Sequence, residues 1–289
     1  MRRAAAALMV LIGSVALAGC SAPHSVPESA PSSPPAFVAE STPDGFERWD
    51  LVGLWRVSDA EGTDGDTWLY LGADEARVWS DCGFQFGGWS AGGGKVIVDI
   101  YMWHMGCSTK DGQPAIPWLS DTVGYESAAE GWTLLSATGE VTARLRIDGV
   151  PPPHPDTNDD ARQQPVLDDD LRTLLRDVSP PDDMRTAAAD ELAGRWIPEA
   201  PAPRDPHVAI SADGTWTASD GCNGTRGRWA VAPDESLLTT TGPTTLIGCE
   251  GSGEPGSFGQ ARAAAFDGDV LVLFDGTGAV TGRLVRADD

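Results

Sequence analysis

The sequence predicts a mostly β (α+β) protein built from two tandem antiparallel β domains, each with one short helix. Three observations carry this prediction. A set of glycine, tryptophan and cysteine landmarks occurs twice at a nearly constant offset. Short strand-like runs are separated by turn residues in both copies. Each copy has about 100 residues, which is enough for one modest hydrophobic core.

The two copies share the order and spacing of their landmarks. In the C-terminal copy these are Leu192, Gly194, Trp196, Cys222, Gly227, Trp229, Cys249, Gly278, Val280, Thr281, Arg283 and Leu284. In the N-terminal copy they are Leu51, Gly53, Trp55, Cys82, Gly87, Trp89, Cys107, Gly139, Val141, Thr142, Arg144 and Leu145. Partners lie 139 to 142 residues apart. So small a drift indicates a tandem duplication of one domain.

A further motif runs through the C-terminal copy, residues 191–287. It consists of Gly221-Cys222-Asn223, then Gly227-x-Trp229, a threonine-rich segment ending in Cys249, a short helix and a final hairpin. This order resembles the META domain family of the HslJ type, with Trp229 where the family usually has tyrosine. The N-terminal copy, residues 49–148, has Gly83 in place of the asparagine and resembles the family more weakly. The resemblance implies an envelope or stress-related role and no known reaction.

The N-terminus has the features of a bacterial lipoprotein signal. Two arginines precede an apolar segment, residues 4–17, which is too short to span a bilayer stably. The segment ends in Leu17-Ala18-Gly19-Cys20, which resembles a lipobox. We expect residues 1–19 to be a signal peptide and Cys20 to carry a lipid that holds the protein at the extracytoplasmic face of the cell membrane. The alternative is a plain secretory signal in which Cys20 is incidental.

Two segments predict connections rather than domains. Residues 20–48 are rich in proline, serine and alanine, so we expect a disordered tether. Residues 149–190 contain three consecutive prolines and predict a linker with a short amphipathic helix. The apolar positions of that helix are Leu171, Leu174, Leu175 and Val178. They follow the acidic residues 168–170, which favour a helix N-terminus, and a proline pair at 180–181 should end the helix.

The balance of charge excludes one class of partner. The formal net charge is −23, and removal of both signal-peptide arginines lowers it to about −25. A chain this acidic is repelled by nucleic acid and by anionic lipid headgroups, so we expect no nucleic-acid binding. Attachment to the membrane therefore has to come from the lipid.

The five cysteines divide into one lipid site and two pairs. Once Cys20 is assigned to the lipid, each copy retains two cysteines. Exported proteins reach an oxidising compartment, so we expect the bridges Cys82–Cys107 and Cys222–Cys249. The alternative is a metal or redox site. No second cysteine or histidine lies at ligand spacing and Cys-x-x-Cys is absent, so we expect neither a metal nor a cofactor.

Strands dominate the local pattern of both copies. We expect strands at 67–71, 76–79, 95–103, 132–136 and 140–147, and again at 207–211, 215–220, 225–231, 236–241, 244–249, 270–274 and 279–286. Asp213-Gly214 and residues 275–278 predict hairpin turns. Ser257 and Gln260 form a capping box, so we expect a helix through the alanine-rich segment 261–265, with Gly268 after its end.

Three motifs that would indicate chemistry fail in their context. Residues 88–92 match a nucleophile elbow but lack the following helix, and their place in the repeat is a strand leading into a turn. Residues 251–256 match a dinucleotide fingerprint without a βαβ unit. Residues 156–167 begin like a calcium loop but lack its glycine and terminal glutamate. Of the four histidines, His24 and His154 lie in segments that look disordered, and His104 and His207 have no repeat counterparts. We therefore assign no catalytic residue.

The tryptophans are the strongest indication of binding. Eight of the eleven lie in the N-terminal copy. Trp55 and Trp89 have counterparts in Trp196 and Trp229, so we expect these four in the core. The unpaired rings of the N-terminal copy offer a groove for an envelope glycan, lipid or peptide, with Trp68, Trp103 and Trp118 as the candidate ligand-binding residues. The alternative is that they fill the core.

Taken together, these features predict a lipid-anchored extracytoplasmic protein with a non-catalytic binding or structural role at the cell envelope. The alternative is an accessory enzyme that acts on cell-wall or lipid material. A cluster of titratable groups in one pocket would favour the enzyme, and an aromatic groove without such a cluster would favour binding. The ligand and the oligomeric state are not encoded in any motif of the chain.

Overall fold

The structure is a computed structural model that describes residues 47–63, 66–81, 83–103, 109–110, 112, 116–153, 159–248 and 254–287. Antiparallel strands dominate it, so the predicted mostly β class is confirmed. The predicted signal peptide, the lipid site Cys20 and the tether up to residue 46 lie outside the described residues.

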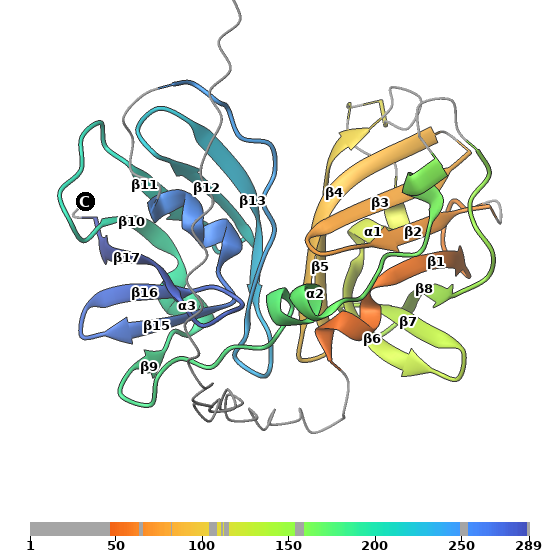
Figure 1. Ribbon diagram of the computed structural model, residues 1–289, viewed down its shortest axis with the longest axis horizontal. Coiled ribbons are helices and arrows are strands. Elements are labelled where there is room, and N and C mark those ends of the chain that lie inside the picture. Colours follow the sequence, from red (N-terminus) through yellow and green to blue (C-terminus); the bar gives the residue numbers. More distant parts are fainter. Residues whose placement is uncertain are drawn as a thin grey trace, which may run out of the picture. The chain divides into compact units, whose positions relative to one another are not determined.

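Eight strands of the N-terminal half form a closed barrel, which we call the N-terminal barrel (Figure 1). They are β1 (Gly53–Ser58), β2 (Trp68–Leu71), β3 (Glu75–Ser80), β4 (Gly83–Gly92), β5 (Lys95–Trp103), β6 (Thr122–Ala128), β7 (Gly131–Ser136) and β8 (Val141–Arg146). Each strand pairs with the next, and β8 returns to β1. The pairing of β5 with β6 is the shortest, with the single register pair Lys95 and Gly124.

Nine strands form a second sheet, which we call the C-terminal sheet (Figure 1). They are β9 (Arg185–Thr186), β10 (Gly194–Pro198), β11 (His207–Ile210), β12 (Thr215–Ser219), β13 (Gly224–Val231), β14 (Leu237–Thr239), β15 (Ala263–Asp267), β16 (Val270–Phe274) and β17 (Val280–Arg286). Their order is β14-β13-β12-β11-β10-β17-β16-β15-β9. Strands β10 to β17 thus follow the order of β1 to β8, including the pairing of the first strand with the last.

The difference between the two sheets lies at one seam. The C-terminal sheet has no ladder between β14 and β15, and the short strand β9 occupies the outer edge of β15 instead. One backbone hydrogen bond crosses near the seam, from the Leu237 amide to the Arg262 carbonyl at 2.9 Å. The seam lies where the pairing in the N-terminal barrel is also weakest.

The helices are short. They are α1 (Pro117–Ser120), α2 (Asp169–Leu174) and α3 (Ala189–Leu192), together with the 3-10 helices η1 (Arg48–Leu51), η3 (Asp159–Arg162) and η4 (Glu254–Gln260). In the described ranges, no helix has both the length and the apolar character needed to cross a membrane. The predicted helix of the linker is confirmed in α2, where the Asp168 carboxylate accepts the Leu171 amide at 2.8 Å. It ends at Leu174, earlier than the proline pair.

The helix predicted for residues 261–265 is wrong. The 3-10 helix η4 ends at Gln260, and the alanine-rich segment that follows is strand β15. Alanine favours a helix by less than 1 kcal/mol per residue. Strand β15 instead makes ladders with β16 on one side and β9 on the other. Its alanines also pack into two different clusters, Ala264 in the main core and Ala265 on the opposite face.

Most other predicted strands are confirmed within two residues, with two kinds of difference. Residues 244–248 of the predicted strand 244–249 form no strand and are exposed. The sequence pattern also does not predict strands β1, β4, β6, β9 and β10. In β4 and β6 the glycine-rich and mixed sequences lack a clear alternation of apolar and polar residues. The rejected nucleophile-elbow motif lies at the end of β4 and leads into a turn, as its place in the repeat indicated.

Each half encloses its own hydrophobic core. Leu51, Trp55, Trp89 and Leu145 belong to the core of the N-terminal barrel. The corresponding residues Leu192, Trp196, Trp229 and Leu284 belong to the core of the C-terminal sheet. All four tryptophans predicted for the core are therefore buried.

The described residues of both halves belong to one compact unit. A small apolar cluster joins them, formed by Ile97 of β5 with Ala232 and with Leu238 of β14. The Lys95 ammonium also donates to the Val231 carbonyl at 3.2 Å. The segment predicted as a linker takes part in packing as well, because the Gln164 side chain binds both backbone groups of Leu54 at 2.8 and 2.9 Å.

Candidate functional site

The Gly-Cys-Asn motif forms a tight loop between β12 and β13. The Asp220 carboxylate accepts the amides of Cys222 at 2.7 Å and of Asn223 at 2.5 Å. Gly221 has a φ of +90°, and a Cβ at this position would lie 2.7 Å from Arg204 Cβ. Glycine is required there because both the backbone conformation and the space exclude a side chain.

The asparagine of the motif ties this loop to a distant segment. Its Oδ1 atom accepts the Ile247 amide at 2.5 Å, and its Nδ2 atom donates to the Ile247 carbonyl at 3.1 Å. Cys222 is disulfide-bonded. Cys249 lies outside the described residues, as do Cys82 and Cys107. The position of Ile247 beside Asn223 brings the chain two residues before Cys249 to the motif, so this part of the motif is a structural clamp.

The Gly-x-Trp part of the motif is a packing device. A Cβ at Gly227 would lie 1.9 Å from the Thr240 carbonyl oxygen, and one at Gly87 would lie 2.2 Å from the Asp99 carbonyl oxygen. Glycine thus lets neighbouring strands approach in both halves. The Trp229 indole donates to the Ser211 carbonyl at 2.9 Å, as Trp89 does to Gly72 at 3.0 Å.

Two of the three candidate groove residues, Trp68 and Trp118, are buried and cannot line a surface groove. Trp68 and Trp118 are each only 3% exposed. Trp118 packs into the barrel core from α1. Trp68 belongs to a cluster with Leu54 that Ala161 of the linker segment covers. Trp103 is half-buried at the end of β5. Tryptophan alone therefore does not form a groove, and the rings of Trp68 and Trp118 fill the interior.

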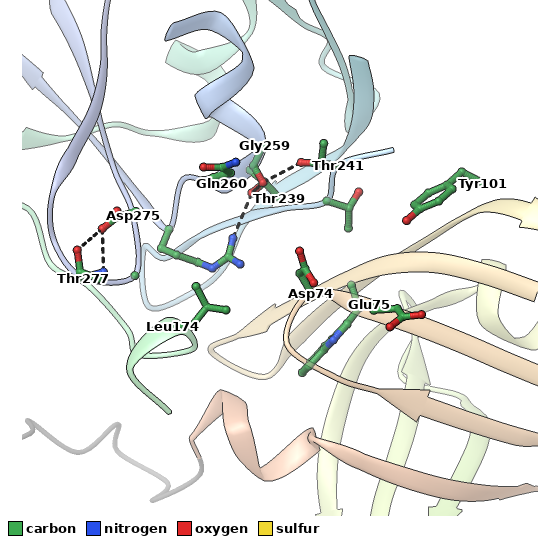
Figure 2. A pocket seen from close by; sticks show the side chains of 14 residues that line it. Asp74, Glu75, Tyr101, Leu174, Thr239, Thr241, Gly259, Gln260, Asp275 and Thr277 are labelled. Carbon is green, nitrogen blue, oxygen red and sulfur yellow. Dashed lines mark hydrogen bonds between the residues drawn. The ribbon is translucent and has the colours of Figure 1, made fainter. Parts of the chain in front are cut away.

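A pocket of about 490 Å³ lies where the N-terminal barrel meets the C-terminal sheet (Figure 2). The barrel contributes the turn before β3 and part of β4 and β5. The C-terminal sheet contributes β14 with the residues after it, η4 and the turn after β16. The lining residues are Asp74, Glu75, Trp89, Tyr101, Leu174, Thr239, Thr240, Thr241, Gly259, Gln260, Arg262, Asp275, Gly276 and Thr277.

Threonines hold the upper wall of the pocket in place. The Thr239 hydroxyl lies 3.0 Å from the Gly259 carbonyl and 3.1 Å from the Ala261 carbonyl. The Thr241 hydroxyl donates to the same Gly259 carbonyl at 3.0 Å, as Figure 2 shows. A Cβ at Gly259 would lie 2.1 Å from Thr241 Oγ1. The wall therefore depends on glycine and on these hydroxyl contacts.

Carboxylates lie on the opposite sides of the pocket. Asp74 is exposed, and Glu75 forms an ion pair with Arg77. The Asp275 carboxylate accepts the Thr277 amide at 2.8 Å and its hydroxyl at 2.6 Å. Burial by itself would raise the pKa of Asp275, but the hydrogen bonds from Thr277 and the following amides hold it below its ordinary value.

Arg262 is the buried cation of the pocket. Arg262 is only 6% exposed to solvent. Its Nη1 atom makes two long contacts, 3.4 Å to Thr239 Oγ1 and 3.3 Å to the Ala261 carbonyl, and its Nε atom has no partner. Burial, together with the charge of Arg48, lowers the pKa of Arg262 to about 10, although Asp74 and Asp275 oppose this. The guanidinium remains charged at neutral pH.

An aromatic side chain completes the pocket. Tyr101 of β5 is half-buried and lies across from the threonines in Figure 2. Burial raises the pKa of its hydroxyl, and the charges of Asp74, Glu75 and Asp99 raise it further. The phenol is therefore neutral at physiological pH and can donate a hydrogen bond or contact an apolar face.

The pocket lining, as far as the described residues form it, includes no histidine, cysteine or serine. Metal-binding groups of three or more His, Cys, Asp or Glu side chains do not occur in the ranges described. The sequence alone does not predict this pocket, because its residues come from distant segments of the chain, from Asp74 in the N-terminal barrel to Thr277 after β16. One signal was present, since Arg262 interrupts an alanine-rich run that otherwise indicates burial.

Comparison with protein-family models, with curated proteins and with solved structures finds no match to this chain.

Proposed function

We propose that this chain is a lipid-anchored extracytoplasmic protein of two tandem META-like domains that binds a small, hydroxyl-rich ligand at the cell envelope without transforming it. The observation that carries the proposal is the pocket between the two halves. It combines hydroxyl groups, carboxylate acceptors, one guanidinium and a phenol ring. Sites for hydroxylated ligands typically use such convergent polar groups beside an aromatic face.

The duplication is supported by the equivalence of the two sheets. Strands β1 to β8 and β10 to β17 have the same order. The equivalent residues Gly87 and Gly227 both allow a close approach of strands, and Trp89 and Trp229 make equivalent bonds. The assignment to the META family still rests on the residues of the Gly-Cys-Asn and Gly-x-Trp motifs.

The non-catalytic role is supported by the state of the carboxylates. A general acid needs a pKa raised toward neutrality. The pKa of Asp275 is held below its ordinary value, and its Oδ1 atom is occupied within its own turn. Glu75 is engaged with Arg77. An accessory enzyme acting on cell-wall or lipid material is the alternative, and this pocket offers it no matched acid and base.

The anchoring is tested separately from the binding. Replacing Cys20→Ser should release the protein from the membrane fraction or leave the precursor uncleaved, because the serine cannot form the lipid thioether. Normal processing together with unchanged detergent partitioning would refute the anchor.

Binding is tested with the Cys20→Ser protein and glucose as the probe. Trp89 lines the pocket, so a saturable change in tryptophan fluorescence should report occupancy. Tyr101→Ala should weaken the binding at least several-fold. Met102→Ala is the matched control, because Met102 is the neighbouring residue on β5, is 54% exposed and does not line the pocket. An equal loss of binding in Tyr101→Ala and Met102→Ala would contradict the proposed function. So would the absence of any saturable fluorescence change when the Cys20→Ser protein is titrated with glucose and then with an acidic sugar.

A further inference from the structure

The least expected feature of the pocket is the environment of Arg262. Two arginines are buried in the described part of the chain, Arg48 at 2% and Arg262 at 6% exposure. Arg48 has the Asp177 carboxylate at 3.3 Å. In the same described part, no carboxylate lies within 4 Å of Arg262. Burying a charge without a counter-ion costs several kcal/mol, so proteins rarely retain one that has no role.

The guanidinium is oriented from one side only. Thr239 and the Ala261 carbonyl contact Nη1, and Thr239 is itself held by the carbonyls of Gly259 and Ala261. The Nε atom has no partner, and Arg262 lines the pocket. A fixed guanidinium with free donors matches the two oxygens of a carboxylate or a phosphate, which accept parallel hydrogen bonds from such a fork.

The surrounding charges select against highly charged ligands. Arg48 is near enough to lower the pKa of Arg262, so one additional negative charge here relieves a repulsion between two buried cations. Asp74 and Asp275 lie farther from the guanidinium than ion-pair distance and face the same pocket. They would repel a second negative charge but accept hydrogen bonds from neutral hydroxyl groups.

We propose that Arg262 is the anchor of an anion subsite, and that the ligand of this pocket carries one carboxylate or phosphate on a hydroxyl-rich body, as an acidic sugar does. This inference rests on the proposed function and adds the acidic group to its ligand. The acid group pairs with Arg262, the hydroxyl groups reach the carboxylates and threonines, and the ring lies toward Tyr101. The pairing supplies the counter-ion that the fold leaves out.

Three probes separate the features of this ligand. Glucuronate has a carboxylate on a sugar ring, glucose has the ring alone, and inorganic phosphate has the anion alone. The Cys20→Ser protein, whose pocket has its wild-type residues, should bind glucuronate at least tenfold more tightly than glucose. Phosphate that competes with glucuronate would support the same anion subsite and indicate that it also accepts a phosphate group.

Two substitutions locate the effect. Arg262→Met keeps the length of the side chain and removes its charge, so glucuronate should then bind no better than glucose, while glucose binding stays as in the wild type. Arg262→Lys keeps the charge but loses the fork, so it should retain an intermediate preference. The exposed, pocket-remote Arg172→Met is the matched control and should leave all three affinities unchanged.

The outcomes distinguish the two proposals. Equal binding of glucose and glucuronate to the wild type would overturn the anion subsite and leave the proposed function standing. Binding of phosphate alone would support the anion subsite and overturn the hydroxyl-rich ligand. If the Arg262→Met variant still prefers glucuronate over glucose, a group other than Arg262 binds the carboxylate, and the proposal is overturned. The comparison of glucose with glucuronate on the protein with an unchanged pocket tests the anion subsite even if an Arg262 variant fails to fold.

Discussion

Trp55 and Trp196 make the same hydrogen bond in the two halves of the protein. Each indole Nε1 atom donates to a backbone carbonyl four residues earlier, Leu51 for one and Leu192 for the other, at 2.8 Å in both cases. Both rings are buried. The bond ties β1 in one half and β10 in the other to the short helical turn that precedes each strand, so the entry of the chain into each core is built in the same way.

Replacing Trp196→Phe should destabilise the protein by about 1–3 kcal/mol, because the Leu192 carbonyl loses its donor in a buried place. Urea denaturation of the wild type and the variant measures this difference. Trp55→Phe should cost a similar amount if the two bonds are equivalent. A change below about 0.5 kcal/mol in both variants would show that the equivalent bonds do not support the fold.

Replacing Gly259→Ala should destabilise the protein by about 1–3 kcal/mol, because the new Cβ would lie 2.1 Å from Thr241 Oγ1 and 2.8 Å from the Trp216 ring. Gly256→Ala is a control in the same 3-10 helix, where a Cβ would meet nothing within 4 Å. Thermal unfolding should lower the melting temperature of the first variant only. Equal melting temperatures of the Gly259→Ala and Gly256→Ala variants would mean that the pocket wall can shift to accept the new Cβ at little cost in stability.

The pH dependence of stability should contain a contribution from Asp220. Hydrogen bonds from the Asn223 amide, and next from the Cys222 amide, lower the pKa of Asp220 even though burial acts in the opposite direction. A lowered pKa in the folded state adds stability above the unfolded pKa of about 3.9, and this stability is lost as the pH falls through the folded value.

The Asp220→Asn variant lacks this titration. We therefore expect the wild type to be more stable than the variant at pH 7, and the difference to shrink as the pH falls below about 4. Thermal unfolding at pH 7, 5 and 3 measures it. A difference that stays constant over this range would show that the Asp220 charge adds nothing to the clamp.

Peptide mapping without reduction should find Cys222 linked to Cys249, since Asn223 holds the chain at Ile247 beside the motif. It should also find Cys82 linked to Cys107. Reduction should lower stability by about 3 kcal/mol for each bridge, the value that loops of this size have in the chain-entropy model. A bridge between the two halves would contradict the tandem arrangement as well as the pairing.

Local patterns alone were enough to predict many of the strands. Residues 95–103 and 270–274 alternate or cluster apolar side chains between turn residues, and both are strands within the predicted bounds. The hairpin at Asp213-Gly214 is confirmed, with the Gly214 amide bonded to the Ser211 carbonyl at 3.2 Å. These strands and this turn depend on residues that are close together in the chain, so the local sequence is sufficient to predict them.

The sequence by itself determined the mostly β class, the repeat of landmarks, the burial of the four paired tryptophans and the α2 helix. Only the tertiary structure decided that the alanines before Gly268 form a strand, because their two neighbouring strands supply hydrogen bonds that no local pattern encodes. It also decided that Trp68 is buried, because a segment about 90 residues later covers it. The pocket around Arg262 has the same origin, since its charges and hydroxyls converge only when the two halves pack together.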